Sequence, residues 1–245
     1  RAIMRMCSLA MSKLLLDNGI EPIMQISCRD RNKIGLQSDI LGANALGIKN
    51  ILCITGDSVK AGDQQDAKAV HEFESVRLLK QIQDFNNGYD PSYEFLIDKK
   101  TNIFAGAAAD PSCKNRRILK MRTEKKKEAG ANFLQTQMIM DKQYLIDFCR
   151  DITEPLRLPV IAGVFLLKSY KNALFINKYV PGARIPDNIL KRLKDSKEPL
   201  NEGINIASEQ IRDFISIGQG VHIMAVKCEE LIPEIIKRSE INLEY

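Results

Sequence analysis

The feature that most constrains this chain is a unit that recurs along it: a helical stretch, a glycine and then a short apolar strand. The unit occurs through Gly19, Gly47 and Gly130, and again through the pair Gly218 and Gly220. Glycine is favoured at such a junction because it tolerates the left-handed conformation that ends many helices. We therefore expect each helix to stop at its glycine and the chain to continue into a strand.

Six apolar runs have the composition of buried strands. They are PIMQISC (22–28), NILCI (50–54), TNIFAGAAA (101–109), FLQTQMIM (133–140), LPVIAGVFLL (158–167) and GVHIMAV (220–226). Strands that alternate with helices predict parallel βα units, and continuous apolar character predicts that both faces of the sheet are covered. Even spacing, without a Gly-x-Gly-x-x-Gly motif, favours a (β/α)8 TIM barrel over a doubly wound dinucleotide fold.

A barrel of this kind needs eight strands to close, and the sequence supplies six. We therefore expect the first two strands, about 50 residues, to precede Arg1 in the native chain. On this interpretation residues 1–245 are one barrel domain that is incomplete at its N-terminus.

Composition narrows the classes of function. No apolar run is long enough to span a membrane, and the chain carries a net charge of +5. Much of that charge lies in 114–128, which we interpret as a solvated helix face and not as a nucleic-acid footprint, since aromatic residues are not interleaved with it. None of the six cysteines forms a Cys-x-x-Cys pair or a zinc-type cluster, so we expect no metal site and a reduced, cytoplasmic protein.

Polar residues at the predicted strand ends are the candidates for chemistry, because the carboxyl ends of barrel strands build active sites. Asp57 ends the run 50–54, and it is either a site carboxylate or a turn former. Gln135 and Gln137 lie two residues apart and share a face, where a ligand or a buried water would satisfy them. Arg29 and Arg31 either bind phosphate or are loop charges.

Two further residues have a structural interpretation on pattern alone. His222 lies within a strand and is expected to be a hydrogen-bonded core histidine. Lys126 is one of three adjacent lysines and is expected at the surface.

Four long motifs resemble the methylenetetrahydrofolate reductase family. They are CRDRNKIGLQSDILGANALGIKNILCITGD, AGANFLQTQ, AGVFLLKSYKNALFINKYVPGARIPD and GVHIMAV, and the resemblance covers essentially the whole chain. It is strongest to bacterial forms with roles in one-carbon metabolism, including methionine biosynthesis and acetogenesis. The resemblance implies a flavoprotein that reduces 5,10-methylenetetrahydrofolate to 5-methyltetrahydrofolate, in which reduced flavin gives hydride to a ring-opened folate iminium cation.

The resemblance assigns residues by position. Asp57 would be the catalytic residue, stabilising the iminium cation and tuning the flavin. The positions implied to bind the cofactor are Gln25, Ile54, Thr55, Gly56, Asp57, Gly106, Ala107, Ala108 and Lys126. Those implied to bind folate are Asp57, Gln137, Asn172 and Val226. For Lys126, implied to approach the flavin phosphates, this reverses the surface interpretation given above.

Several departures from the family keep alternatives open. Gln25 and Ala108 stand where relatives often have His and Tyr, and Leu166 replaces a Pro. The changes at Gln25 and Ala108 fall near the cofactor and leave FAD as the expected flavin with FMN as the alternative. The family's general-acid glutamate and a flavin-contacting threonine would lie on the two strands expected before Arg1.

The electron donor is NADH, NADPH or a partner subunit with iron–sulfur centres, and we expect an oligomer or a complex. The alternative function is a non-catalytic barrel that acts as a docking scaffold in a larger redox complex. A barrel lyase or aldolase would need a Schiff-base lysine at a strand end, which the sequence does not clearly provide.

Overall fold

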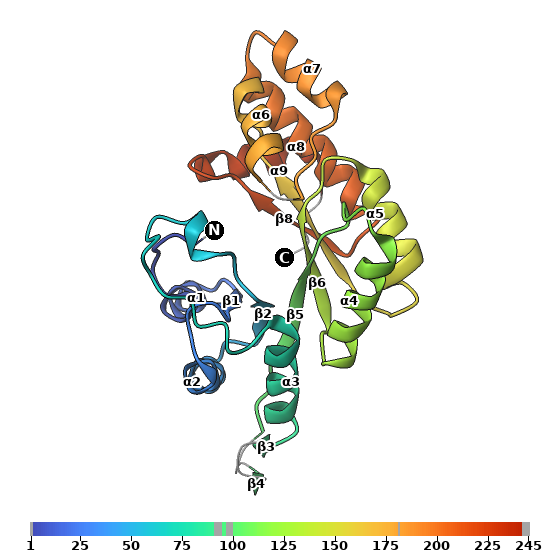
Figure 1. Ribbon diagram of the computed structural model, residues 1–245. Helices are drawn as coiled ribbons and strands as arrows, with labels where there is room; N and C mark the ends of the chain where they lie inside the picture. The colour runs from blue at the N-terminus through green and yellow to red at the C-terminus, as the bar shows by residue number, and fades with distance from the viewer. Residues whose placement is uncertain (1, 91–94, 97–99, 181, 242–245) are drawn as a thin grey trace. The chain divides into compact units, whose positions relative to one another are not determined.

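The six predicted strands form one parallel sheet in a computed structural model that describes residues 2–90, 95–96, 100–180 and 182–241 (Figure 1). Its strand order is β1-β2-β5-β6-β7-β8. These strands are β1 (Ile23–Ser27), β2 (Asn50–Ile54), β5 (Phe104–Ala109), β6 (Phe133–Met138), β7 (Val160–Phe165) and β8 (Gly220–Met224). The alternation of helix and strand read from the sequence is therefore confirmed.

The helices and the minor elements fill the intervals between these strands. The helices are α1 (Ser8–Asp17), α2 (Lys33–Ala45), α3 (Ser75–Asn86), α4 (Arg116–Glu128), α5 (Lys142–Phe148), α6 (Tyr170–Tyr179), α7 (Asp187–Asp195), α8 (Pro199–Ile215) and α9 (Ile232–Ser239). Short helical turns occupy η1 (Val59–Ala61), η2 (Cys149–Thr153) and η3 (Glu229–Leu231). An antiparallel pair, β3 (Tyr89–Asp90) with β4 (Phe95–Leu96), was not predicted.

The chain divides into two compact units. The first comprises Arg1–Ala108 and Glu124–Phe133, and the second comprises Ala109–Thr123 and Leu134–Tyr245. In the first unit α1 packs against β1, and α3 packs against β2. In the second unit α8 packs against both β7 and β8. Each unit thus buries strands under helices of its own.

The predicted glycine junctions are confirmed at three of the four repeats. Gly19, Gly47 and Gly130 have φ values of +76°, +81° and +101°, in the left-handed region. At the fourth junction α8 and β8 flank the glycines as predicted, but the expected left-handed conformation is wrong, because neither Gly218 nor Gly220 has a positive φ. A Cβ at Gly218 would lie 2.9 Å from the carbonyl oxygen of Val160, so this glycine allows close approach to the start of β7.

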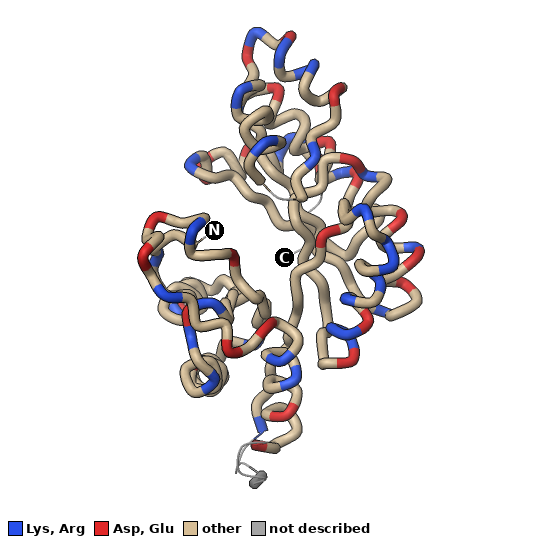
Figure 2. Tube along the Cα trace, viewed as in Figure 1, with Lys and Arg blue, Asp and Glu red and all other residues tan. Residues whose placement is uncertain are grey.

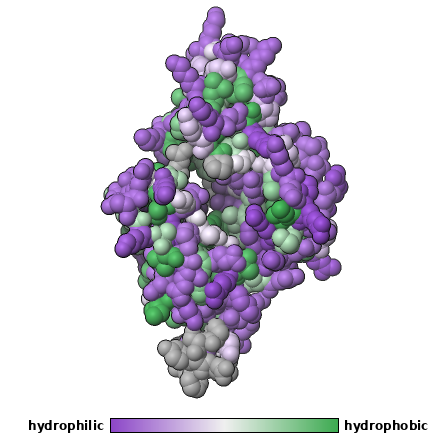
Figure 3. Space-filling model, in the orientation of Figure 1, coloured by the Kyte–Doolittle hydropathy of each residue, from purple (hydrophilic) through white to green (hydrophobic). Residues whose placement is uncertain are grey.

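Surface character agrees with the composition. Hydrophilic side chains make up most of the visible face in Figure 3, and Figure 2 shows the Lys and Arg residues along α4. Within α4 only Leu119 and Thr123 are buried, so the basic run is a solvated helix face as predicted. Across the described ranges, none of the helices is both long enough and apolar enough to cross a lipid bilayer.

The cysteines are free thiols, and three of them lie in the core. Burial raises the pKa of Cys28 to about 11, with a contribution from the Glu74 charge, and burial also raises the pKa of Cys53. Both belong to the first unit, whereas the buried Cys149 belongs to the second. Cys28 and Cys53 are therefore buried core thiols that are held in the protonated form.

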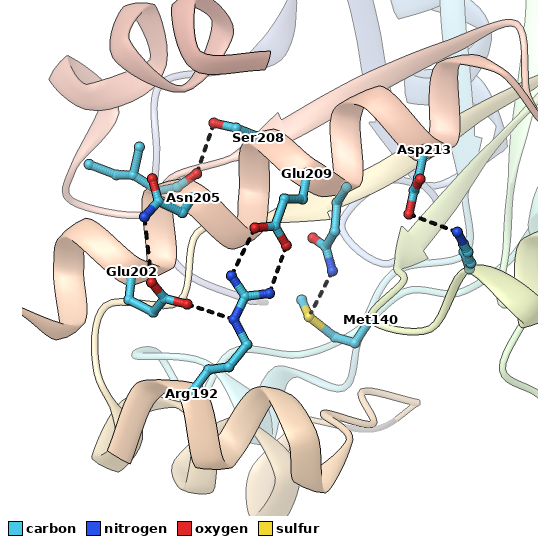
Figure 4. A network of polar contacts seen from close by, with 10 residues as sticks. Met140, Arg192, Glu202, Asn205, Ser208, Glu209 and Asp213 are labelled. Carbon is cyan, nitrogen blue, oxygen red and sulfur yellow. Dashed lines mark hydrogen bonds and ion pairs between the residues drawn. The ribbon is translucent and has the colours of Figure 1, made fainter. Parts of the chain in front are cut away.

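An arginine joins two helices of the second unit (Figure 4). The guanidinium of Arg192, on α7, donates to both carboxylate oxygens of Glu209 at 2.7 and 2.9 Å. Its Nε also donates to Glu202 at 2.6 Å. Both carboxylates lie on α8, and the Arg192 hydrogen bonds lower the pKa of Glu209 despite partial burial. Such a bidentate pair fixes the relative orientation of α7 and α8.

A hydrogen bond from a histidine spans three strands of the second unit. The Nε2–H group of His222, on β8, donates to the carbonyl oxygen of Thr136, on β6, at 2.9 Å. Between them lies Gly163 of β7, where a Cβ would come within 2.9 Å of the His222 ring. Burial lowers the pKa of His222 below its usual 6.5, against the opposing effect of the Thr136 hydrogen bond. The interpretation of His222 as a hydrogen-bonded core histidine is confirmed.

A strand glycine of the first unit makes room for an aromatic ring. A Cβ at Gly106, on β5, would collide with the ring of Phe133. That ring also stacks on Phe104, with the two centroids 5.6 Å apart and the planes at 8°. We expect Gly106→Ala to lower the free energy of unfolding by about 1–3 kcal/mol, because the extra methyl group overpacks a filled site.

Urea denaturation measures this change, and Gly220→Ala is the matched control. Gly220 also lies on a strand, but no atom lies within 4 Å of a Cβ placed there. Equal stability of the two variants would show that the Phe133 ring moves aside without cost.

The shifted pKa of His222 predicts a component of stability that depends on pH. The folded state favours the neutral ring, so below about pH 6.5 the unfolded chain binds a proton that the folded chain does not. Stability from this group is complete above that pH and decreases as the pH falls toward the lower folded pKa. We expect His222→Gln to remove this component, so the difference in unfolding free energy from the parent should change between about pH 7.5 and 5.5.

Denaturation at a series of pH values tests the assignment, with His71→Gln as the control. His71 is the other histidine of the chain and is exposed. If His222→Gln and the parent protein gave parallel curves, the core histidine would not be the titrating group.

Candidate functional site

The end of β2 places Asp57 at the surface through a turn that only glycine permits. Gly56 has a φ of +95°, and a Cβ there would collide with Ser27 Oγ and lie 2.8 Å from Cβ of Arg29. Nη1 of Arg29 donates to the backbone carbonyl of Asp57 at 3.3 Å. The turn is therefore held in place from the end of β1, and the Asp57 side chain is exposed beyond it.

Thr55 has a structural role in the same turn. Its Oγ1 accepts a hydrogen bond from the backbone N–H of Ser75 at 3.2 Å, at the first residue of α3. This bond satisfies an amide that has no partner within the helix. Thr55, which the resemblance assigns to cofactor binding, thus also anchors the start of α3.

The two arginines after β1 are paired with carboxylates. Arg29 donates through Nε and Nη2 to Asp30 at 2.6 and 2.7 Å, and only 13% of its side chain is exposed. The hydrogen bond that Arg29 donates to Asp30 raises the pKa of Arg29. Arg31 pairs with Asp39 at 2.5 Å. The sequence suggests that Arg29 either binds phosphate or is an exposed loop charge. Neither interpretation describes it, because Arg29 is largely buried and paired with Asp30.

A cavity of about 500 Å³ lies beside these residues within the first unit. Its wall includes Gln25 from the middle of β1 and Ile54 from the end of β2, together with Ser27, Arg29 and residues of the segment 2–8. Gln25 is exposed toward solvent, and Ile54 is half-buried. The structure therefore brings two of the predicted cofactor positions to one cavity.

The end of β5 is joined to α4 in the first unit. Nζ of Lys126 donates to the carbonyl oxygen of Ala108 at 2.6 Å, and the Lys126 side chain is half-buried. Ala107 is fully buried and Gly106 faces the Phe133 ring, so Ala108 is the exposed member of this turn. Lys126 therefore lies at a strand end, and the expectation from pattern alone that it is a surface lysine was incomplete.

In the second unit Gln137 lies at the end of β6. Its Oε1 accepts a hydrogen bond from the backbone N–H of Met138 at 3.0 Å. Gln135 and Gln137 are both half-buried, whereas Thr136 between them is buried, which agrees with a shared face for the two glutamines. The pairing of β6 with β7 shifts register between Gln135 and Met138, so the strand end is irregular where Gln137 lies.

The loops after β7 and β8 hold the remaining predicted positions. Asn172 is half-buried in the first turn of α6, and Val226 is 55% exposed after β8. Both are hydrogen-bonded to Lys168, a residue that the sequence analysis did not single out. Lys168 is the first charged residue after the apolar run 158–167, which is the same signal that identified Asp57.

The predicted positions thus fall into two groups. Those of the cofactor group lie in the first unit: Gln25, Ile54, Thr55, Gly56, Asp57, Gly106, Ala107, Ala108 and Lys126. Gln137, Asn172 and Val226 lie in the second unit. In the part of the chain that the structure describes, no cluster of three His, Cys, Asp or Glu side chains is arranged to hold a metal ion.

Comparison with known proteins relates the chain to one protein family. A family profile for methylenetetrahydrofolate reductase matches residues 2–240. A probable methylenetetrahydrofolate reductase (NADPH) of Caenorhabditis elegans is 25% identical over 226 residues, which cover 89% of this chain and 32% of that protein. Methylenetetrahydrofolate reductase 2 of Schizosaccharomyces pombe is 27% identical over 240 residues, which cover 90% of this chain and 36% of that protein.

The chain spans about a third of the length of the curated relatives that it matches. A solved structure with the same fold is an uncharacterized protein from Clostridium thermocellum that binds two copies of 5-methyl-5,6,7,8-tetrahydrofolic acid. The two align with a TM-score of 0.62 at 16% identity, over 93% of this chain and 76% of that one. On the whole-chain match to the family profile, this chain belongs to the methylenetetrahydrofolate reductase family.

Proposed function

We propose that this protein reduces 5,10-methylenetetrahydrofolate to 5-methyltetrahydrofolate with a bound flavin. The observation that carries the proposal is the family match over residues 2–240, which includes every strand end that bears a candidate site residue. The folate bound by the Clostridium thermocellum neighbour supports the choice of substrate. The proposal includes a full (β/α)8 barrel, because evenly spaced parallel βα units without a Gly-x-Gly-x-x-Gly motif favour that fold over a doubly wound sheet.

The residues of the first unit fit a flavin. The cavity of about 500 Å³ has the size of a small-molecule site and combines apolar Ile54 with polar Gln25. Lys126 supplies a cation at the end of β5, suited to the cofactor's phosphate, and Ala108 leaves that strand end free of a bulky side chain. When bound, the flavin would supply the hydride. FAD remains the expected form, with FMN as the alternative.

Four residues would act on the folate. The reactive substrate is an iminium cation, and the Asp57 carboxylate would lower its energy. Because Oε1 of Gln137 accepts from Met138, the Gln137 amide hydrogens are the groups that would reach an acceptor on the pterin. Asn172 would add a second amide, and Val226 an apolar wall. The electron donor would be NADH, NADPH or an iron–sulfur partner subunit.

Three measurements on the purified protein test this function. The mass of the flavin released on denaturation identifies FAD or FMN. Anaerobic mixing with NADH or NADPH, followed by 5,10-methylenetetrahydrofolate, should first bleach and then restore the flavin absorbance, with 5-methyltetrahydrofolate detected by mass spectrometry. A protein that takes up no flavin after reconstitution with either form would refute the proposal and favour the scaffold alternative.

Asp57→Asn tests the proposed carboxylate, since it preserves the shape and removes the charge. We expect folate reduction to slow by about 10²-fold, as when other preorganised electrostatic groups are removed. A carboxylate beside the cofactor also disfavours its anionic reduced form. If that interaction is about 1.4 kcal/mol, the two-electron potential should rise by about 30 mV in the variant.

Stopped-flow kinetics and a redox titration measure the two effects. Asp66→Asn is the matched control, because Asp66 is an exposed carboxylate in the same segment after β2. Wild-type turnover together with an unchanged potential in Asp57→Asn would leave Asp57 as a turn residue.

A further inference from the structure

Two loops of the second unit follow adjacent parallel strands. The pairing of β7 with β8 continues to Phe165 opposite Met224, and the N–H of Leu166 donates to the carbonyl of Met224 at 3.0 Å. The chain leaves both strands at this point. Ligands of open parallel sheets and barrels bind outside the carboxyl ends of the strands, so the relative position of these two loops bears on binding.

Lys168 is bonded to both loops. Its backbone N–H donates to Oδ1 of Asn172 at 3.2 Å, within the loop after β7. Its Nζ donates to the carbonyl oxygen of Val226 at 3.1 Å, across a separation of 58 residues, in the loop after β8. Asn172 is held further by Ser169, whose Oγ caps α6 by accepting the Asn172 N–H at 3.1 Å.

The loop after β8 has an uncommon backbone conformation, which a hydrogen bond from another loop would stabilise. Lys227, the residue after Val226, has a φ of +60°, which is uncommon for a residue other than glycine. The N–H of Cys228 donates to the carbonyl of Ala225 at 2.8 Å, so the chain makes a tight turn around Val226. The ammonium of Lys168 binds the carbonyl of Val226, which lies inside this turn.

The ammonium of Lys168 is also electrostatically matched to this loop. Backbone hydrogen bonds from residues 227–229 lower the pKa of the Glu229 carboxylate, and the Lys168 charge adds to the effect. Lys168 itself is half-buried, and its hydrogen bond to Val226 lies at the exposed end of the side chain.

We propose that Lys168 is a positioning residue for the folate: it fixes the wall at Val226 relative to the amide of Asn172. This inference rests on the proposed function. Because the Lys168 backbone occupies Oδ1 of Asn172, the Asn172 amide hydrogens are turned toward other acceptors. The Lys168 side chain holds the carbonyl of Val226, and so fixes the backbone that carries the exposed Val226 side chain. Lys168 itself need not touch the ligand.

Lys168→Met tests the side-chain contact alone, since it keeps the length of the side chain and the backbone N–H that binds Asn172. We expect KM for 5,10-methylenetetrahydrofolate to rise about 10-fold, with the rate of flavin reduction by the donor unchanged. Lys168→Arg should recover most of the lost affinity, because the guanidinium can donate to the same carbonyl.

Lys171→Met is the matched control, because Lys171 is an exposed lysine three residues along in the first turn of α6. It should retain the parent KM. Lys168→Gln provides a second variant if Lys168→Met does not fold. Equal KM values for the Lys168 and Lys171 variants, or a parallel loss of flavin reduction in Lys168→Met, would overturn the positioning role.

Calorimetric titration with 5-methyltetrahydrofolate separates this inference from the proposed reaction. A parent protein that binds this folate but does not reduce 5,10-methylenetetrahydrofolate would refute the reaction alone. In that case weaker binding by Lys168→Met would support the role of Lys168, and unchanged binding would refute it. A parent protein that does not bind the folate at all would refute both.

Discussion

The structure depends on one constraint, which is that parallel strands pair only through crossover connections and so become covered on both faces. In β2 the consequence is direct: Ile51, Leu52 and Cys53 are all buried, and no position within that run can hold a polar group in reach of a ligand. Polar chemistry is displaced to the ends of the strands and to the residues that follow them. Gln137 lies at the end of β6, and Asp57 and Lys168 follow β2 and β7, although the three residues lie in different units.

That constraint also explains how much of the fold the sequence predicts. The apolar runs identify all six strands of the sheet. The expected burial of both faces holds in β2 but not in β1, where Ile23 and Gln25 are exposed between buried residues. The runs overstate the strands, however: Thr101 and Ile103 are buried before β5 begins, and Leu166 and Leu167 are buried after β7 ends. Side chains are thus buried beyond the ends of the assigned strands. The apolar character of the sequence indicates burial only, so it does not locate those ends. The two-residue strands of the β3–β4 pair are too short to produce any pattern.

The sequence predicts where the candidate site residues lie along the chain, but not the hydrogen bonds around them. The rule that strand ends carry chemistry locates Asp57 and Gln137 from the sequence. It does not foresee that Arg29 reaches the Asp57 backbone, that Lys126 binds the carbonyl of Ala108, or that Lys168 binds that of Val226. Each of these contacts joins residues from 18 to 58 positions apart. Their existence depends on strand register, which periodicity along one segment does not contain.

The reactivity of the buried thiols can report local opening of the structure. Only a thiolate reacts readily with alkylating reagents, and burial holds Cys28, Cys53 and Cys149 in the protonated form inside the core. Modification of these residues therefore requires that the surrounding structure open first. Cys28 and Cys53 belong to the first unit, and Cys149 belongs to the second. Their separate rates of alkylation therefore distinguish the local opening of each unit without an introduced probe.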